Sequence, residues 1–292
     1  MALDQHQPYR EDGVLWEDAP TPEHVGLVLS GGAARGAAHV GVLEVLDEHR
    51  IPIDSIIGVS VGSVVGGFYA AGVPPVQMRT LIGDIRWTTI SSFNLPSLRL
   101  SGFSLSAMNL PMGLFSLDKL VDYVHDTLGG PIDFSSLNVP FAAVAADVTN
   151  NQLVVLNQGD IAEAMRVSSA VPGIFLPVRR DGRLLVDGGA INNLPASISR
   201  QLGAQYVIAV DLLPPEGTDF VEPRNMLDLT FVSLYSLVRA AQVDNAAVSV
   251  KISPDIAHIR MADFRQTAEL LAAGRAAAEA ALPEIKAALS LD

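Results

Sequence analysis

The sequence contains no cysteine, no long uninterrupted apolar run and no cluster of basic residues. The absence of cysteine excludes disulfide bonds, thiol chemistry and cysteine-ligated zinc. No window approaches the roughly 18 consecutive apolar residues that span a bilayer, and the N-terminal segment lacks the apolar stretch of a signal peptide. The 32 acidic residues outnumber the 19 basic ones, which gives a net charge of −13. We therefore expect no nucleic-acid partner and no electrostatic docking to an anionic membrane.

Apolar residues are abundant by contrast, since they make up 49% of the chain and the mean hydropathy is +0.32. Without a spanning segment, this excess points to a buried parallel sheet or to a surface that faces lipid. A chain of 292 residues can form one large α/β domain. We expect a polar N-terminal tail over 1–24, flexible or loosely docked, a core over 25–200, and a strand plus covering helices of the same domain over 201–292.

A pattern of strand, turn, helix, strand, turn and helix occupies residues 26–67. Apolar runs at 25–29 and 56–59 are typical of buried parallel strands, and one face of a helix over 37–49 is apolar. The first turn, 30–36, is rich in glycine, and the second contains the pattern G-x-S-x-G. Because the carboxyl ends of parallel strands meet at one edge of a sheet, the sequence predicts that the two turns lie side by side.

The glycine-rich turn admits a nucleotide-binding interpretation, which two features oppose. A dinucleotide fingerprint requires glycine where Ala33 stands, and its ribose-binding acid would occupy the position of Ser60. A P-loop is excluded because no lysine followed by serine or threonine comes after the glycines. The N–H groups of Gly32 and Ala33 could instead stabilise an acyl oxyanion, because the first turn of a helix leaves its amides unpaired. A purely structural turn stays open, and Arg35 could brace the loop or hold a lipid phosphate.

The G-x-S-x-G pattern lies between an apolar strand and a helix of small residues. In this context it predicts a nucleophile elbow, in which Gly58 and Gly62 let the strand and the helix approach closely. The sharp turn pushes the hydroxyl of Ser60 outward. We therefore predict that Ser60 is a nucleophile, against the alternative that it only caps the helix.

The group that would accept the serine proton has several candidates. His258 is the only histidine after Asp147, so a Ser-Asp-His triad would have to use it. A carboxylate could take the proton directly instead, and three predicted strands end in aspartate: Asp147, Asp187 and Asp211. Asp187 has a small advantage, because two glycines follow it and permit a tight turn.

Three further segments carry expectations about structure. The irregular segment 87–115 holds no acidic residue, and we interpret it as a loop with short helices that forms a lid, a wall of a lipid-access path or an ordinary surface loop. An apolar stripe predicts a long helix over 225–247. A covering helix is expected over 262–291, in which Pro283 starts a new helix or kinks the first.

The ordered motifs resemble those of the patatin-like phospholipase family, in particular its bacterial stand-alone members. Residues 31–36 resemble the family's G-G-G-x-R/K-G oxyanion loop, and residues 58–62 resemble its nucleophile elbow. Residues 187–189 are similar to its D-G-A/G motif, and residues 168–177 to its stretch S-x-x-x-P-x-x-F-x-P. Together the motifs cover roughly residues 25–200.

The resemblance implies a three-layer α/β/α sandwich with a mostly parallel central sheet, and a Ser-Asp dyad that hydrolyses acyl esters of lipids without a metal or other cofactor. It selects Asp187 as the base for Ser60. The implied supporting positions are the oxyanion loop of Gly31, Gly32, Ala33, Ala34, Arg35 and Gly36, the elbow glycines Gly58 and Gly62, and the acid-loop glycines Gly188 and Gly189. Ala33 departs from the family pattern by replacing the third glycine. A required positive φ would make this alanine costly and the oxyanion hole suspect.

We therefore expect a serine acylhydrolase that acts on phospholipids, lysophospholipids or related esters. One alternative is a non-catalytic lipid-binding or regulatory protein of the same fold. Another is a thioesterase or acyltransferase with a triad through His258. The expected partner is a lipid or acyl-ester substrate, and we expect a cytoplasmic protein for which peripheral membrane contact stays open. The sequence leaves the head group, acyl position, chain length and oligomeric state undetermined.

Overall fold

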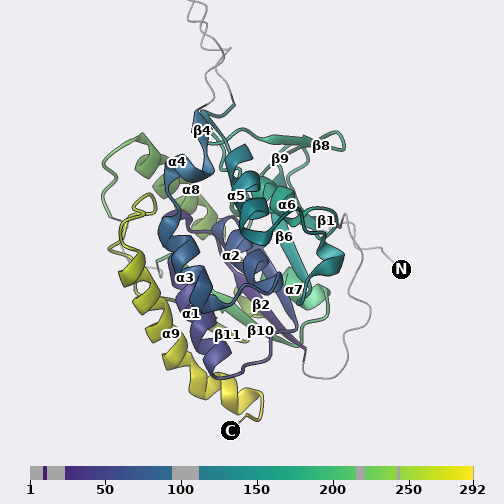
Figure 1. The fold of residues 1–292 in the computed structure, drawn as a ribbon, viewed down its shortest axis with the longest axis vertical. Helices are drawn as coiled ribbons and strands as arrows, with labels where there is room; N and C mark the ends of the chain where they lie inside the picture. The colour runs from purple at the N-terminus through teal and green to yellow at the C-terminus, as the bar shows by residue number, and fades with distance from the viewer. Residues whose placement is uncertain (1–8, 12–23, 94–111, 215–220, 242–243, 292) are drawn as a thin grey trace, which may run out of the picture.

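The computed structural model describes residues 9–11, 24–93, 112–214, 221–241 and 244–291 (Figure 1). Its strands are β1 Tyr9–Glu11, β2 Val25–Leu29, β3 Ser55–Val59, β4 Ser92–Phe93, β5 Phe115–Ser116, β6 Phe141–Asp147, β7 Gln152–Leu156, β8 Val178–Arg180, β9 Arg183–Asp187, β10 Tyr206–Val210 and β11 Val250–Ile252. The buried apolar runs of the sequence therefore form the strands that they predict.

The helices are α1 Ala37–Glu48, α2 Val61–Ala70, α3 Pro75–Asp84, α4 Trp87–Ile90, α5 Asp118–Leu128, α6 Ile161–Ser168, α7 Ala196–Gln201, α8 Met226–Ala241 and α9 Thr267–Ala288. Short 3-10 helices are η1 Ala33–Gly36, η3 Phe134–Ser136, η4 Gly188–Ala190 and η5 Asp244–Ala247. Within the part of the chain that the structure describes, no helix combines the length and apolar composition needed to cross a membrane.

The main sheet has nine described strands in the order β1-β7-β6-β3-β2-β10-β11, with β9 paired to β6 and β8 to β9. The central strands β6, β3, β2, β10 and β11 are parallel to their neighbours in this row. Strands β7 and β9 run antiparallel to β6. The sheet is therefore mixed, with a parallel centre.

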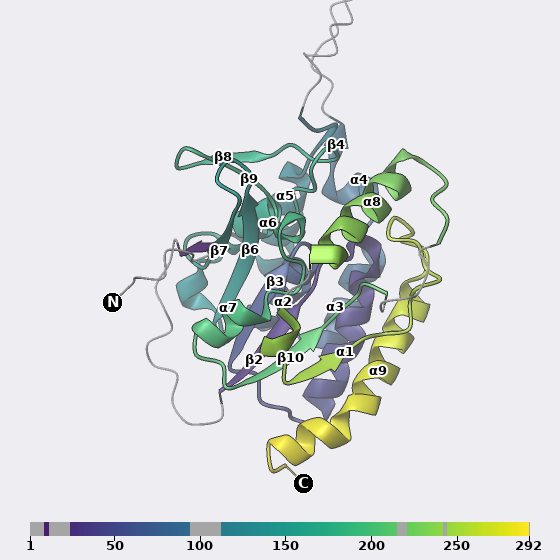
Figure 2. The same cartoon turned by 180° about the vertical axis from the view of Figure 1, so that it is seen from behind.

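Helices cover both faces of this sheet, which confirms the predicted α/β/α sandwich. The larger apolar core lies between one face and α1, α2, α3, α5, α6 and α9, and it includes Leu27 and Leu29. The smaller core lies against the other face, under α7, and includes Val28. Figure 1 shows α1, α3 and α5 in front of the sheet, and Figure 2 shows α7 on the opposite side. Burial on both faces explains why β2 is continuously apolar rather than alternating.

Two strands meet at the middle of β6. Strand β3 pairs with β6 as far as Val59, which lies opposite Val144. Strand β9 runs toward it along the same edge and ends with Asp187 opposite Ala145. Since β7 occupies the other edge of β6, the end of β3 and the end of β9 face each other. The sequence predicted that a strand ends at Asp187, whereas the reversed direction of β9 was not predicted.

At the periphery, the structure differs from the sequence-based expectations in several details. Residues 9–11 of the expected tail form β1, which pairs in parallel with β7, so β7 is not the outermost strand (Figure 2). Helix α9 continues through Pro283, so Pro283 does not begin a new helix, while a kink at this residue stays a prediction. Helix α8 ends at Ala241, and a short 3-10 helix follows it. Of segment 87–115, α4, β4 and β5 are described, and residues 94–111 lie outside the described residues.

Candidate active site

Ser60 occupies the turn between β3 and α2, as the G-x-S-x-G pattern predicts. Its backbone has φ 52° and ψ −125°, a strained conformation that costs about 1–3 kcal/mol and is typical of functional sites. Two serines hold the turn. Ser60 N–H donates to Ser168 Oγ at 2.9 Å, and Ser63 Oγ donates to the Ser60 carbonyl at 2.6 Å. The surrounding structure therefore stabilises a turn that serine alone would avoid.

The two elbow glycines allow the close approach that the sequence predicts. A Cβ atom at Gly62 would overlap the carbonyl oxygen of Leu29, and one at Gly58 would overlap the backbone of Ser63. The first turn of α2 is therefore pressed against the carboxyl end of β2. Larger residues at either position would move the turn that carries Ser60.

Asp187 lies beside Ser60 because β9 and β3 meet on β6. Its side chain is buried, and its Oδ1 accepts the Gly189 N–H at 2.8 Å. Its Oδ2 has no hydrogen-bond partner within 3.5 Å among the described residues. The Ser60 hydroxyl is close enough to this carboxyl group to act on it as a hydrogen-bond donor that lowers its pKa. A Cβ at Gly188 would overlap the Val144 carbonyl oxygen, so the turn after Asp187 packs tightly on β6.

Burial raises the pKa of Asp187 to about 7. The Ser60 hydroxyl and the Gly189 N–H oppose this rise, because hydrogen bonds to a carboxylate favour its ionised form. A carboxyl group with a pKa near neutral pH is a stronger base than an ordinary aspartate. The pair therefore has the arrangement that proton transfer from serine to aspartate requires.

The other candidate bases have partners of their own. Asp147 Oδ1 accepts hydrogen bonds from Thr149, and Asp211 Oδ1 accepts the Leu213 N–H at 3.0 Å. His258 is exposed and pairs with Glu269 at 2.7 Å. A triad through His258 therefore has no support in the described structure.

His39 is fully buried, and its Nε2 lies 2.8 Å from the Ser30 carbonyl oxygen. Burial lowers the pKa of His39 to about 4, although the hydrogen bond with Ser30 opposes this shift. His39 is therefore neutral at physiological pH and satisfies the backbone at the start of the glycine-rich turn.

The glycine-rich loop uses part of its backbone within the protein. Its internal hydrogen bonds run from Gly31 N–H to Asn193 Oδ1 (3.2 Å), from Ala34 N–H to the Met261 carbonyl (2.8 Å) and from Arg35 N–H to the Gly32 carbonyl (3.0 Å). In the described part of the chain, the N–H groups of Gly32 and Ala33 donate to no protein acceptor. Of the predicted oxyanion loop, these two amides are available to a ligand. Gly36 instead permits close packing, since a Cβ there would overlap the side chain of Val61.

Ala33 has φ 48°, in the left-handed region. The loop therefore does not have the negative φ at which alanine could replace glycine without an energetic cost. A left-handed conformation costs a residue with a Cβ about 1–2 kcal/mol. The strained residue is therefore one whose own N–H is available to a ligand.

Arg35 holds the loop in place through hydrogen bonds of its side chain. Its side chain is buried, and its guanidinium donates to the carbonyl oxygens of Leu212 (3.1 Å), Ala257 (3.2 Å) and Ile259 (2.6 Å). Burial lowers the pKa of Arg35 to about 10, against a smaller opposing effect of Tyr235. The hydrogen bonds favour bracing over the alternative that Arg35 holds a lipid phosphate.

Two residues that lie near the site were not predicted from the sequence. Asn193 is fully buried and binds both the N–H and the carbonyl of Gly31, each at 3.2 Å. Tyr235 of α8 is also buried, and a Cβ at Gly31 would lie 3.2 Å from its Oη and 3.1 Å from Ser60 Cβ. Burial, and then the charge of Asp187, raise the pKa of Tyr235. Asn193 follows the acid-loop motif closely, which could have signalled it, whereas Tyr235 is hidden in an apolar helical stripe.

An apolar cavity opens from Ser60. Ala33 and Ser60 line one part of it, and the aromatic residues Trp87, Phe175 and Phe264 line another. Trp87 stacks on Phe175 with ring centroids 5.2 Å apart. Segment 87–115 thus contributes to the wall of this cavity through Trp87 and Ile90, while its role as a lid stays a prediction.

The fold and the site define an α/β protein with a serine on a strained strand-to-helix turn, beside a buried aspartate. Residues 27–199 match the sequence profile of the patatin-like phospholipase family, so the chain belongs to that family, which is one of lipid hydrolases. The family predicted from the ordered motifs is confirmed.

The relatives are longer proteins. The chain is 38% identical over 188 residues to an uncharacterized NTE family protein of Mycobacterium tuberculosis, covering 64% of this chain and 49% of that protein. It is 35% identical over 207 residues to human patatin-like phospholipase domain-containing protein 6, covering 68% of this chain and 14% of that protein. The chain therefore spans half or less of the length of these relatives. Among solved structures, VipD from Legionella pneumophila has a similar fold, with a TM-score of 0.50, 15% identity, and coverage of 90% of this chain and 67% of that one.

Proposed function

We propose that the protein is a serine hydrolase that cleaves fatty-acyl esters of phospholipids or lysophospholipids. The observation that carries the proposal is the position of Ser60, between the free Oδ2 of buried Asp187 and the unpaired amides of Gly32 and Ala33. An apolar cavity adjoins the serine and suits an acyl chain. Membership of a phospholipase family supports a lipid ester as substrate.

In the first step, Asp187 Oδ2 accepts the proton of Ser60 Oγ while Oγ attacks the ester carbonyl carbon. The carbonyl oxygen becomes an oxyanion and receives hydrogen bonds from the N–H groups of Gly32 and Ala33. One such donor typically lowers the barrier by about 3–4 kcal/mol. When the carbon–oxygen bond to the alcohol breaks, protonated Asp187 returns the proton to the leaving alkoxide.

In the second step, a water molecule attacks the acyl-enzyme. Asp187 accepts one proton from this water, and the oxyanion forms again at the same two amides. The bond between the acyl carbon and Ser60 Oγ then breaks, and Oγ takes the proton from Asp187. The fatty acid leaves, and the enzyme returns to its starting state.

Hydrolysis of p-nitrophenyl esters of several chain lengths tests the nucleophile. We expect Ser60→Ala to lose at least about a thousandfold in kcat, because the covalent route is removed. Ser236→Ala, on the exposed face of α8, is the matched control and should keep full activity. A fluorophosphonate should label the wild type at Ser60. Unchanged hydrolysis in Ser60→Ala would refute the proposal, and absence of labelling would favour a non-catalytic lipid-binding protein.

The identity of the base is tested separately. Asp187→Asn keeps the shape of the side chain but cannot accept the serine proton, so we expect it to be inactive. His258→Ala should keep wild-type activity, because His258 pairs with Glu269 at the surface. The opposite pattern would replace the dyad by a triad.

A further inference from the structure

Four arginines line one open cleft of this acidic protein: Arg86, Arg224, Arg260 and Arg265. They come from three distant segments, namely the turn before α4, the segment before α8 and the loop before α9. We call this feature the arginine cleft. In a chain with 19 basic and 32 acidic residues, such a grouping is a local reversal of the overall charge.

The carboxylates in the arginine cleft do not balance these charges. Asp228 lies 3.8 Å from Arg260 Nε, and Asp263 forms two hydrogen bonds with Arg265. These are the two acidic residues in its lining, so two positive charges remain in excess. The exposed guanidinium of Arg224 forms no hydrogen bond or ion pair with any described residue.

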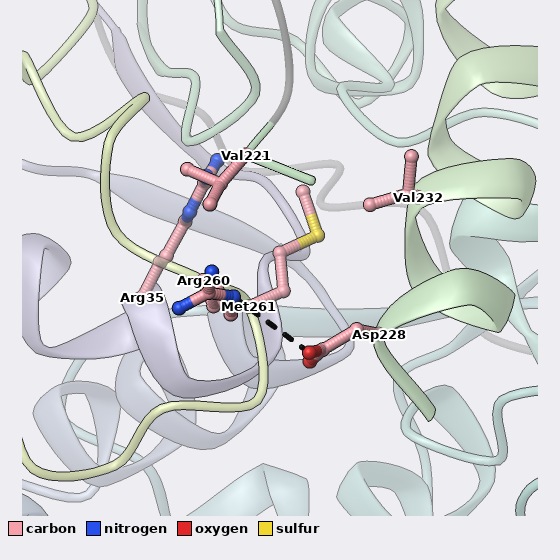
Figure 3. A pocket seen from close by; sticks show the side chains of 6 residues that line it. All are labelled: Arg35, Val221, Asp228, Val232, Arg260 and Met261. Carbon is pink, nitrogen blue, oxygen red and sulfur yellow. Dashed lines mark ion pairs between the residues drawn. The ribbon is translucent and has the colours of Figure 1, made fainter. Parts of the chain in front are cut away.

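Two residues that line the cleft also carry buried N–H donors that lack acceptors. Within the described residues, neither Arg260 Nε nor Trp87 Nε1 has a hydrogen-bond partner. Figure 3 shows Arg260 beside Asp228 and Met261, and the dashed contact to Asp228 is an ion pair that is too long for a hydrogen bond. Buried donors are costly when unpaired. Oxygen atoms of an anionic ligand would satisfy both donors and the excess charge, and arginine is suited to phosphate oxygens.

The arginine cleft adjoins the apolar cavity at Ser60. Trp87 and Phe264 line both spaces. Arg260 directly precedes Met261, whose carbonyl accepts the Ala34 N–H of the oxyanion loop. A single molecule could therefore place an apolar chain in the cavity and a charged group among the arginines.

From these contacts we propose that the arginine cleft binds the phosphate of a phospholipid whose acyl chain occupies the cavity. This assignment rests on the proposed function, because it identifies the head group of the lipid that Ser60 cleaves. Arg224 and Arg260 contact the phosphate oxygens, and Trp87 Nε1 donates to one of them. A neutral glyceride would leave these donors unpaired, so the protein prefers lipids that carry phosphate.

Binding to the full chain with Ser60→Ala tests the cleft independently of hydrolysis. Trp16 is replaced by phenylalanine, so that Trp87 is the remaining one of two tryptophans and reports binding by fluorescence. The probes are dodecylphosphocholine and dodecyl maltoside, which share a chain length but differ in phosphate. We expect Arg224→Ala and Arg260→Gln each to weaken dodecylphosphocholine binding about tenfold, as for a lost charge-assisted hydrogen bond, and to leave dodecyl maltoside binding unchanged. Arg179→Ala, an exposed arginine of β8, is the matched control.

Equal losses for both detergents, or no loss for dodecylphosphocholine, would overturn the proposal. Inorganic phosphate that binds as tightly as dodecylphosphocholine in an Arg224-dependent way would replace the lipid by a free phosphate ion. Hydrolysis gives the second readout: Arg224→Ala should lower kcat/KM about tenfold for lysophosphatidylcholine and leave monoacylglycerol unaffected. If the wild type hydrolyses neither, the proposed enzyme fails, while the detergent measurement still decides the cleft.

Discussion

At the scale of single residues, Asp187 is subject to opposing influences. Burial favours its neutral form, whereas Ser60 and the Gly189 N–H favour the carboxylate. In the proposed mechanism, Asp187 must be ionised to accept the proton of Ser60. Because the pKa of Asp187 is about 7, kcat/KM should rise about tenfold per pH unit below that value and level off above it. A pH profile with a soluble ester checks this, and a plateau that extends down to pH 5 would contradict it.

The raised pKa of Asp187 also makes the stability of the protein depend on pH. Stability falls with rising pH, whereas activity rises. Its pKa is about 7 in the folded protein and about 3.8 in the unfolded chain, so the folded state binds more protons between these values. The stability that Asp187 contributes is therefore present below about pH 4 and lost as the pH rises through 7. We expect Asp187→Asn to become more stable than the wild type, by up to a few kcal/mol, on going from pH 5 to pH 8. Urea unfolding at both pH values measures this, and an equal difference at both would disprove it.

Ala33 carries a cost that a glycine would not. Its φ of 48° is unfavourable for alanine, although glycine gains more freedom in the unfolded chain. Ala33→Gly should raise the free energy of unfolding by up to about 1 kcal/mol. Its N–H stays in place, so ester hydrolysis should remain within a fewfold of wild type. A loss of stability in thermal unfolding would show that the loop does not hold alanine under strain.

At the scale of elements, α9 packs on α1 with its backbone in direct contact, because glycine leaves no side chain between the two helices. A Cβ at Gly274 of α9 would overlap the carbonyl oxygen of Ala38. Gly274→Ala should therefore destabilise the protein by about 1–3 kcal/mol, because α9 must move outward. Gly83→Ala in α3 is the matched control, since nothing lies within 4 Å of its added Cβ, and it should stabilise by about 0.5–1 kcal/mol. Thermal unfolding of both variants gives the comparison, and equal shifts would contradict the tight packing.

The elements that the sequence predicted well are those whose local signal agrees with their burial. Apolar runs such as β2 and β10 are buried on both faces, so their composition alone identifies them. The direction of β9 depends on its pairing with β6, which no local pattern expresses. Strand β1 is three polar residues that form a strand only because β7 offers an edge.

The residues of the candidate site fall into the same two groups, those with a local sequence signal and those that only tertiary packing places. Ser60 and the glycine-rich loop belong to contiguous motifs, and their place was predictable. Tyr235 and the arginine cleft come from segments that are far apart in the chain. Their positions follow from tertiary packing, so no spacing along the chain could have indicated them.

At the scale of the whole molecule, the family match ends at residue 199, before the centre of the sheet is complete. Strand β10 lies between β2 and β11 and contributes Val207 and Ile208 to the two cores. A fragment of residues 1–200 lacks β10 and β11. It would therefore expose one edge of β2 and, next to that edge, the apolar cores on both faces of the sheet. We expect this fragment not to unfold cooperatively when its circular dichroism is followed on heating. A sharp transition near that of the full chain would show that the remaining segment is dispensable.

The meeting of β3 and β9 on one edge of β6 has a consequence for how this chain tolerates changes in length. The spacing of Ser60 and Asp187 is set by two neighbouring rungs of a hydrogen-bond ladder, Val59 with Val144 and Asp187 with Ala145. Residues inserted in the loops between these strands, including the turn from β8 to β9, would leave both rungs in place. One residue inserted within β9 would turn the carboxyl group to the opposite face of the sheet. The loops between these strands can therefore vary in length without altering the relative position of Ser60 and Asp187.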